Sequence, residues 1–402
     1  MAARCPHFGE CGGCAAQDVP YADQLARKAT ALRDLFAPWW DGPIPVTPSP
    51  ELWHYRNKVD PAFGRKHYPE PPPKGFKRET VLGFKRKGRW YWTLDIDECA
   101  IAPEGLGRLL GGVRQWARER DLPAFSTRSH DGFLRVLLVR EGRRTDERVV
   151  VLITTDGPLD DASFVETVLQ SFPATSIQHA VFRGLADVAA ADEVRTLYGP
   201  DAIHERLLVP DDEGPRDITF RFSPFSFFQT NTLATERLYG IVRQWVKRLA
   251  PDVLYDLYGG SGGIALTCAD LVQRVISVES VESATLDGQA NARLNRVDNV
   301  AFETAKVEDW LRDARAGNGL SPNAAVVLDP PRAGLHPKAL RRLNDLAPTN
   351  VLYISCKPPR LAEELNDLAA TYTLTGLQAV DLFPHTDHVE AVAALRRRDA
   401  TE

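Results

Sequence analysis

The stretch that decides the fold is Val253-Leu-Tyr-Asp-Leu-Tyr-Gly-Gly-Ser-Gly-Gly-Ile264, an apolar run that ends in a glycine-rich loop. Further apolar runs of strand length follow at 275–279, 324–329 and 351–356, with helix-like segments between them. Strands that alternate with helices are typical of βαβ units, which form a parallel, doubly wound sheet with ligands at the carboxyl ends of its strands. We therefore expect an α/β fold for residues 217–402.

The glycine-rich loop is typical of a site for a nucleotide-like cofactor. Glycines let the backbone pass close to a ligand and open a helix N-terminus towards it. Glu279 ends the next strand, and a carboxylate there can accept hydrogen bonds from both ribose hydroxyls of an adenosine. NAD enzymes use the same device. However, Asp256 stands just before the glycines, where it suits an ammonium group, and this favours S-adenosylmethionine as the cofactor.

Two later strands end in side chains that can take part in chemistry. Asp329-Pro-Pro-Arg332 forms a rigid turn after one strand; amino-methyltransferases of adenine and guanine use a similar turn, so this motif alone does not name the methylated atom. Cys356 ends the next strand, in the same ligand-facing layer. A ring carbon such as C5 of uracil must be activated by covalent addition at C6, for which a cysteine thiolate is the natural agent, whereas an amino group needs no thiol.

Cysteines mark a second candidate site near the start of the chain. Cys5, Cys11 and Cys14 stand together in a glycine-rich stretch, and Cys99 lies far downstream. Six cysteines in 402 residues are too few for a disulfide scaffold, so the group indicates metal binding or catalysis. Four thiolates suit either zinc or an iron-sulfur cluster. Cys268 falls on the apolar face of a helix, and we expect it in the core.

The charge of the chain is unevenly distributed. The formal net charge is -5, which by itself gives no hint of a nucleic-acid partner. Residues 56–89, however, hold eleven Lys or Arg and three acids, a net charge of +8, which leaves -13 for the rest. Aromatic residues such as Tyr55, Phe63, Phe76 and Trp90 are interleaved with these charges. This pattern suits a surface that binds phosphates and stacks unpaired bases, although a solvated, proline-rich loop would have the same composition.

The remaining features concern domain organisation and location. Residues 21–36 have the periodicity of an amphipathic helix, and short β-like runs such as 133–139 and 149–154 predict a β-rich domain over 41–216. The chain has no run of eighteen apolar residues and no apolar core of a signal peptide. We therefore expect a cytoplasmic protein with no membrane-inserted segment.

Four segments resemble the signature motifs of the RNA uracil-5 methyltransferases, the family of the 23S rRNA and tRNA 5-methyluridine enzymes. The segments are Ser226-Phe-Phe-Gln-Thr-Asn231, Asp329-Pro-Pro-Arg332, Ser355-Cys-Lys-Pro358 and Pro384-His-Thr-Asp-His-Val-Glu390. The early cysteines are similar to the [4Fe-4S] site of the iron-sulfur branch of that family, and the resemblance spans nearly the whole chain.

The resemblance implies three parts: an iron-sulfur segment and helix at 1–40, a central β-rich RNA-binding domain at 41–216 that contributes Cys99, and a Rossmann-like class I methyltransferase domain at 217–402 that uses S-adenosylmethionine. Because the chain begins at the cluster cysteines, we expect no N-terminal TRAM domain, the RNA-binding β-barrel that some relatives carry. The implied partner is structured RNA, with 23S rRNA favoured and tRNA as the alternative, and neither DNA nor a membrane; we expect a monomer.

The resemblance also implies roles for individual residues. Cys356 matches the nucleophile and Glu390 the base that removes the C5 proton. The expected cofactor contacts are Gln229, Tyr258, Gly260, Gly263, Glu279 and Asp329. The expected ligands of a [4Fe-4S] cluster, with zinc as the alternative, are Cys5, Cys11, Cys14 and Cys99. The expected RNA contacts are Arg56, Lys58, Lys85, Arg86 and Lys87.

One departure from the family pattern concerns the adenine. Lys306 stands where relatives carry an Asp or Asn that faces the adenine, so Glu308 or Asp309 has to substitute. Two other functions stay open: an RNA-binding chaperone with the same fold and little activity, and an RNA amino-methyltransferase that uses Asp329. The complete motifs around Cys356 and Glu390 argue against the first, and the second leaves Cys356 without a use.

Overall fold

The computed structural model describes residues 4–70, 72–73, 75–317 and 319–398. Lys74, one of the eleven basic residues counted above, lies outside these ranges. The chain divides into two compact units. The N-terminal unit comprises the segment that ends at Pro20 together with Glu51–Glu205 and Phe222–Phe225. The C-terminal unit comprises Tyr21–Pro50, Arg206–Arg221 and the segment that begins at Ser226.

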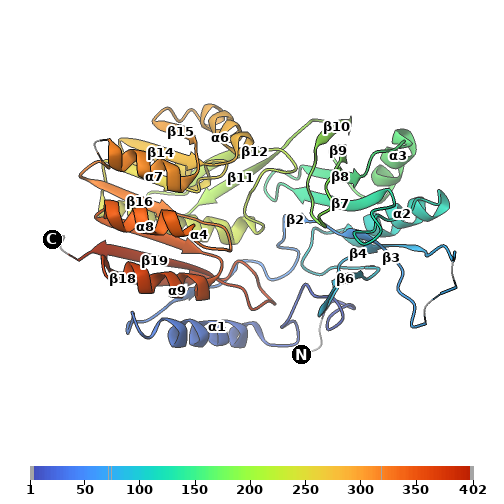
Figure 1. Ribbon diagram of the computed structural model, residues 1–402, viewed down its shortest axis with the longest axis horizontal. Helices are drawn as coiled ribbons and strands as arrows, with labels where there is room; N and C mark the ends of the chain where they lie inside the picture. Colours follow the sequence, from blue (N-terminus) through green and yellow to red (C-terminus); the bar gives the residue numbers. More distant parts are fainter. Residues whose placement is uncertain (1–3, 71, 74, 318, 399–402) are drawn as a thin grey trace. The chain divides into compact units, whose positions relative to one another are not determined.

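An eight-stranded sheet forms the centre of the C-terminal unit (Figure 1), with the strand order β15-β14-β13-β16-β17-β19-β18-β1. Strands β13 to β17 are parallel to their neighbours, whereas β19 is antiparallel to both β17 and β18. The strands are β1 Val46–Thr47, β13 Val253–Leu257, β14 Arg274–Glu279, β15 Val300–Thr304, β16 Ala324–Leu328, β17 Asn350–Ser355, β18 Tyr372–Val380 and β19 Glu390–Arg397. The order of the strands reverses at β13, and such a switch point is where doubly wound sheets bind ligands.

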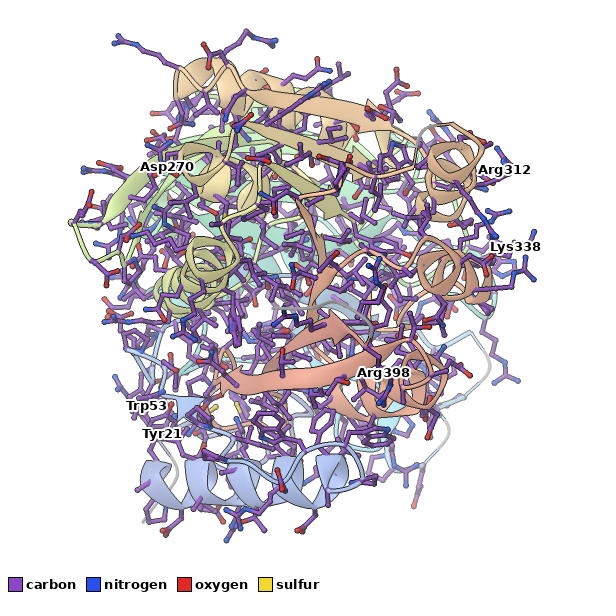
Figure 2. The ribbon with its side chains drawn as sticks, turned by 90° about the vertical axis from the view of Figure 1, so that its left-hand side faces the viewer. Tyr21, Trp53, Asp270, Arg312, Lys338 and Arg398 are labelled. Carbon is purple, nitrogen blue, oxygen red and sulfur yellow. The ribbon has the colours of Figure 1, made fainter. Side chains whose placement is uncertain are left out.

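Helices cover both faces of this sheet, which explains why its central strands read as continuous apolar runs. Helices α7, α8 and α9 lie on one face, and α4 and α5 lie on the other (Figures 1 and 2). The helices are α1 Tyr21–Phe36, α4 Thr232–Leu249, α5 Gly263–Cys268, a 3-10 turn Ala269–Leu271, α6 Glu282–Leu294, α7 Val307–Ala316, α8 Pro337–Leu346 and α9 Pro358–Leu368. The predicted doubly wound fold of this region is confirmed.

Helix α1 groups with the C-terminal unit, whereas the expected first segment ran to residue 40. Leu32 and Phe36 belong to the same apolar core as the sheet and α9. On the buried side of α1, Lys28 forms an ion pair of 2.8 Å with Asp381, and both side chains are almost fully buried. Gln24 accepts the backbone N–H of His385 at 2.8 Å. Helix α1 therefore holds the loop that leads to Glu390. For that reason the first boundary between the two units falls at Pro20.

We expect Lys28→Met to destabilise the protein by about 3–5 kcal/mol, because removal of one partner leaves a buried charge uncompensated. Urea unfolding of the purified protein measures this loss. Lys338, on α8 of the same unit, extends into solvent (Figure 2), so the matched variant Lys338→Met should change stability by less than about 0.5 kcal/mol. Equal stabilities of the two variants would show that the buried pair contributes nothing, and Lys28→Met/Asp381→Leu should recover part of the loss.

A mixed sheet forms the N-terminal unit, with the order β10-β9-β8-β7-β3-β4 and with β2 paired to β7. Its strands are β2 Lys58–Val59, β3 Ala62–Arg65, β4 Thr80–Gly83, β7 Leu134–Glu141, β8 Arg148–Thr154, β9 Ser176–Val181 and β10 Glu193–Tyr198. Helices α2 Leu106–Glu119 and α3 Asp161–Ser171 share an apolar core with it. Two small ribbons complete the list of strands: β5 Lys85–Arg86 with β6 Arg89–Thr93, and β11 Ile203–Val209 with β12 Arg216–Phe222.

The two runs predicted as strands in this region form most of β7 and β8, and both are buried. The boundary expected at residue 216 differs from the observed division, which falls after Glu205 and returns to the N-terminal unit at Phe222–Phe225. None of the helices in the described ranges combines the length and apolar character that a membrane crossing needs.

Candidate functional site

The loop after β13 is tightly packed against its surroundings. A Cβ atom at Gly259 would collide with the Ser277 hydroxyl, and one at Gly263 would lie 2.5 Å from the Tyr239 hydroxyl. Gly260 and Gly262 have positive φ angles of 54° and 87°, a conformation that L side chains rarely adopt. Glycine is therefore required along this loop by both packing and backbone conformation.

Two carboxylates accept hydrogen bonds from the backbone of the loop and of the helix that follows it. Asp256, fully buried at the end of β13, accepts the N–H of Ala265 in the first turn of α5 at 3.1 Å. Glu279, at the end of β14, accepts the N–H of Gly260 at 3.2 Å. Glu279 thus stands beside the loop at the carboxyl end of its strand, the position from which an acid can bind a ribose.

The predicted cofactor residues gather at one pocket. Gln229, Tyr258, Gly260, Gly263 and Asp329 all line it, and Glu279 borders it through its bond to Gly260. The sequence reasoning missed two further lining residues, Phe227 and Tyr239. Phe227 is 64% exposed, and its place inside the Ser226–Asn231 motif, two residues before Gln229, could have indicated it; Tyr239 lies on α4 and carries no local signal.

Two buried acids of this pocket have raised pKa values. Burial raises the pKa of Asp256 to about 7. Burial, together with the charge of Asp256, raises the pKa of Asp329 to about 7 as well. Near neutral pH each carboxyl is therefore only partly ionised, and a cation bound in the pocket would favour the ionised forms. A ligand with a sulfonium and an ammonium group fits such a lining.

We expect binding of S-adenosylmethionine to release protons between about pH 6 and pH 8. The carboxyls are largely protonated below a pKa of about 7, and a cationic ligand stabilises their ionised forms, so the affinity should rise with pH and level off above that range. Calorimetry in two buffers of different ionisation enthalpy counts the protons. S-adenosylhomocysteine, which lacks the sulfonium charge, is the matched ligand and should release fewer; equal release by both ligands would contradict the electrostatic explanation.

Strand pairing brings the predicted catalytic residues to one edge of the sheet. Strand β17 ends at Ser355 and β19 begins at Glu390, and the antiparallel register sets Ser355 opposite Ala391. Cys356 follows Ser355 and Glu390 precedes Ala391, so Cys356 and Glu390 stand opposite each other in the next row of this antiparallel pairing. Asp329 follows β16, the parallel neighbour of β17, so its carboxyl group lies at this edge as well.

The charges of these groups act on one another. Burial raises the pKa of Glu390 to about 8, with a further contribution from Asp329, while Arg332 opposes the shift. The Cys356 thiol, half-buried, has its pKa raised to about 11 by burial and then by Glu390 and Asp329, again opposed by Arg332. Cys356 is thus a neutral thiol in the free protein, and Arg332, which the sequence reasoning gave no role, is the cation that favours its thiolate.

Glu308 and Asp309, the two candidates for the adenine contact, have different surroundings in the structure. Lys306 is exposed immediately before α7. Asp309 pairs with Arg312 and with Arg342 on α8. Glu308 is mostly buried and lies near enough to Tyr258 for its charge to contribute to the raised pKa of that phenol, which burial mainly sets at about 12. Glu308 also lies 4.0 Å from the His336 ring. Of the two candidates, Glu308 is thus the one whose charge acts on a residue of the cofactor pocket.

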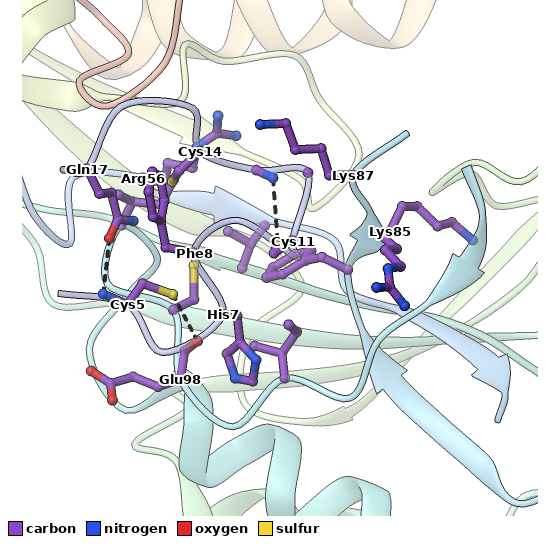
Figure 3. A pocket seen from close by; sticks show the side chains of 18 of the residues that line it. Cys5, His7, Phe8, Cys11, Cys14, Gln17, Arg56, Lys85, Lys87 and Glu98 are labelled. Carbon is purple, nitrogen blue, oxygen red and sulfur yellow. Dashed lines mark hydrogen bonds between the residues drawn. The ribbon is translucent and has the colours of Figure 1, made fainter. Parts of the chain in front are cut away.

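The four predicted metal ligands surround one pocket of the N-terminal unit. Cys5, Cys11, Cys14 and Cys99 line a cavity of about 690 Å³, and all four are free, half-buried thiols. Figure 3 shows the first three of them around this cavity. Burial raises the pKa of Cys99 to about 11 and also raises those of Cys11 and Cys14, and the charges of the other cysteines add to each shift. Within the described ranges, no three His, Cys, Asp or Glu side chains are grouped closely enough to hold a single metal ion.

The predicted RNA contacts lie in part along the same cavity. Arg56, Lys85, Arg86 and Lys87 line it. Lys85 forms an ion pair of 2.7 Å with Asp187. Lys58 is half-buried on β2, and burial together with the charge of Arg140 lowers its pKa. The N-terminal unit therefore encloses much of the Lys58 side chain.

The sequence model of the tRNA (Uracil-5-)-methyltransferase family matches residues 179–398. An RNA methyltransferase of Clostridium tetani is 35% identical over 405 residues, which cover 99% of this chain and 84% of that protein. One from Chlorobaculum tepidum is 34% identical over 413 residues, with 98% and 83% covered.

A solved structure is similar over nearly the whole chain. The crystal structure of the Pyrococcus abyssi tRNA (uracil-54, C5)-methyltransferase in complex with S-adenosyl-L-homocysteine matches with a TM-score of 0.73 and 30% sequence identity. The match covers 96% of this chain and 86% of that one.

Proposed function

Since the chain belongs to the tRNA (uracil-5-)-methyltransferase family and is an S-adenosylmethionine-dependent RNA methyltransferase, we propose that it methylates C5 of one uridine in a structured RNA through a covalent intermediate. The observation that carries the proposal is the row formed by Cys356 and Glu390 at the sheet edge. A thiol next to a buried carboxyl is the pair that addition and elimination at a pyrimidine ring require.

Each residue of this row has a separate task. The Cys356 thiol first loses its proton to solvent, and the charge of Arg332 offsets part of the cost of the thiolate. The sulfur then forms a bond to C6 of the uracil while the electron pair of the C5–C6 double bond moves towards C5 and O4. S-adenosylmethionine, when bound, supplies the methyl group that C5 takes up. Glu390 then removes the proton from C5, and the electron pair of that C–H bond restores the C5–C6 double bond as the bond to Cys356 breaks. The raised pKa makes the ionised form of Glu390 a stronger base than an ordinary carboxylate, and the C5 proton moves to the side chain in that ionised form.

We assign the cofactor to the pocket after β13. The buried acids Asp256 and Asp329 fit its cationic end, and Glu279 fits the ribose. Glu308 is our candidate for the adenine amino group, because its charge acts on Tyr258 of the pocket, whereas Asp309 pairs with two arginines, Arg312 and Arg342.

We propose that Cys5, Cys11, Cys14 and Cys99 hold a [4Fe-4S] cluster. Four thiols around a cavity, rather than three donors converging on one point, suit a polynuclear cluster better than a single zinc ion. The cluster would supply a covalent link between the first residues of the unit and Cys99. Iron, sulfide and zinc analysis of protein purified without oxygen tests this; bound zinc without iron, or a full iron content in Cys11→Ala, would contradict it.

Two RNAs are candidates for the substrate. The sequence favours 23S rRNA, whereas the similarity to the Pyrococcus abyssi tRNA (uracil-54, C5)-methyltransferase supports tRNA. Mapping 5-methyluridine in the tRNA and 23S rRNA of strains with and without the gene identifies the target, because the modified uridine should disappear from one fraction. Loss of a methylated base amine instead would favour the amino-methyltransferase, and RNA binding without any lost methyl group would favour the chaperone.

A further inference from the structure

The basic segment carries two large aromatic side chains that the fold leaves in solvent. Trp90 and Tyr91 on strand β6 are 71% and 57% exposed. Tyr55 and Phe63, which the sequence pattern placed beside the same charges, are only 2% and 4% exposed and belong to the interior. Phe76 is 49% exposed and packs edge-on against Tyr68 at a centroid distance of 5.5 Å. Among the described aromatic residues named here, the most exposed rings are therefore Trp90 and Tyr91 of the hairpin.

The base of the β5–β6 hairpin is held in a fixed position. Trp92 stacks on His67 with a centroid distance of 3.9 Å and lies under the Arg86 guanidinium at 4.5 Å. Thr93 is buried, and a Cβ at Gly64 of β3 would lie 2.6 Å from its Cβ. Trp92 is thus covered by His67 and Arg86, whereas Trp90, two residues earlier on the strand, is 71% exposed.

Pairing with the cysteine loop fixes the other strand of the hairpin. The N–H of Gly12 donates to the carbonyl of Lys85 at 3.0 Å, and the N–H of Lys87 donates to the carbonyl of Glu10 at 2.7 Å. Cys11 and Arg86 form an isolated antiparallel bridge between these bonds. The hairpin therefore presents its exposed rings from a rigid support.

The charges around Trp90 select the chemistry of the partner. Across the described ranges, no acidic side chain forms an ion pair with Arg86, Lys87 or Arg89, whereas Lys85 is paired with Asp187. Trp90, Arg86, Lys87 and Arg89 all line the cysteine cavity. An exposed indole among uncompensated cations is the arrangement that binds a nucleic-acid base by stacking and its phosphates by charge.

We propose that Trp90 stacks on an unpaired base of the substrate RNA while Lys87 and Arg89 bind the phosphates that flank it. Tyr91 supports the indole edge-on, with a centroid distance of 5.8 Å and an interplanar angle of 89°. The inference rests on the proposed function, because it assigns this surface to the RNA that is methylated. It specifies the kind of RNA: a loop or strand with a splayed-out base, because a base inside a duplex has no free face.

The experiment compares two RNA probes of equal length, a single strand of about 12 nucleotides and the corresponding duplex. Trp90→Ala should weaken binding of the single strand about 5- to 150-fold, leave its salt dependence unchanged and leave duplex binding unchanged. Trp90→Phe should restore most of the affinity. Lys87→Ala/Arg89→Ala should instead make the salt dependence shallower by about two phosphate contacts. Tyr198→Ala removes an aromatic residue that is 45% exposed on β10, and it should change none of these values.

Wild-type affinity of Trp90→Ala for the single strand, or an equal loss for strand and duplex, would overturn the stacking. Methyl transfer to bulk RNA is measured on the same preparations. An inactive wild-type enzyme would count against the proposed uridine chemistry, whereas the comparison of affinities decides the stacking in either case.

Discussion

Cys356→Ala should lose methyl transfer by on the order of 10⁴-fold or more, because without the thiol no addition at C6 can activate C5. RNA that carries 5-fluorouridine gives the sharpest measurement. Fluorine at C5 cannot be removed as a proton after the methyl group has arrived, so the bond between the wild-type enzyme and the RNA persists and appears as a shifted band on a denaturing gel. Cys356→Ala should form no such band.

Cys268→Ala is the matched control for this variant. Cys268 is fully buried on α5, and burial raises its pKa to about 12, so it has neither the access nor the acidity of a nucleophile. Its alanine variant should keep the adduct, at a modest cost in stability. An adduct in Cys356→Ala, or its loss in Cys268→Ala alone, would show that another residue attacks the uracil.

Glu390→Gln should reduce turnover about 10²- to 10⁴-fold and trap the methylated RNA on Cys356. The amide keeps the size of the side chain but cannot accept the C5 proton, so addition and methyl transfer proceed while elimination stops. Mass spectrometry of the trapped complex with unmodified RNA should find both the RNA and the added methyl group. Asp387→Asn, an exposed acid of the same loop, should turn over normally. A fall in turnover of less than about tenfold without trapped RNA would mean that a different base removes the proton.

The raised pKa of Glu390 gives a second measurement that does not depend on activity. Its folded pKa of about 8 lies above the ordinary value of about 4.3, so the folded state binds the extra proton between these values. The contribution of Glu390 to stability is therefore largest below about pH 4 and is lost as the pH rises towards about 8. Glu390→Gln removes this dependence, and the variant should gain thermal stability over wild type as the pH is raised across that range. An unchanged difference between the two proteins would contradict the buried, protonated state.

The sequence predicted the parts of the site that depend on local order along the chain. Glycines after a strand, an acid at the end of the next strand and a cysteine at the end of a third are local patterns, and parallel pairing of the strands then brings them to one edge. Glu279, Asp329 and Cys356 could be placed at the ligand-facing edge for this reason. The cofactor contacts of Gln229 and Tyr258 were instead implied by the family resemblance, and Gln229, Tyr258 and Asp329 line one pocket.

The parts that could not be predicted depend on partners far apart in the sequence. The Lys28–Asp381 pair joins residues 353 positions apart, and no periodicity in α1 indicates which charge it will meet. Burial of Tyr55 and Phe63 likewise follows from the packing of the whole N-terminal unit, so composition alone could not separate these core aromatics from the exposed Trp90.

The position of β19 has a consequence for the synthesis of the protein. This strand is the last in sequence among the described residues, yet it lies between β17 and β18 in the sheet. A nascent chain that lacks it exposes β17, whose apolar residues Val351 to Ile354 are fully buried in the finished protein, and such an open edge invites pairing with other chains. Because Glu390 is the first residue of β19, the strand that closes the sheet also brings the proposed base to the proposed nucleophile. The docking of β19 between β17 and β18 therefore completes both the sheet and the proposed catalytic pair.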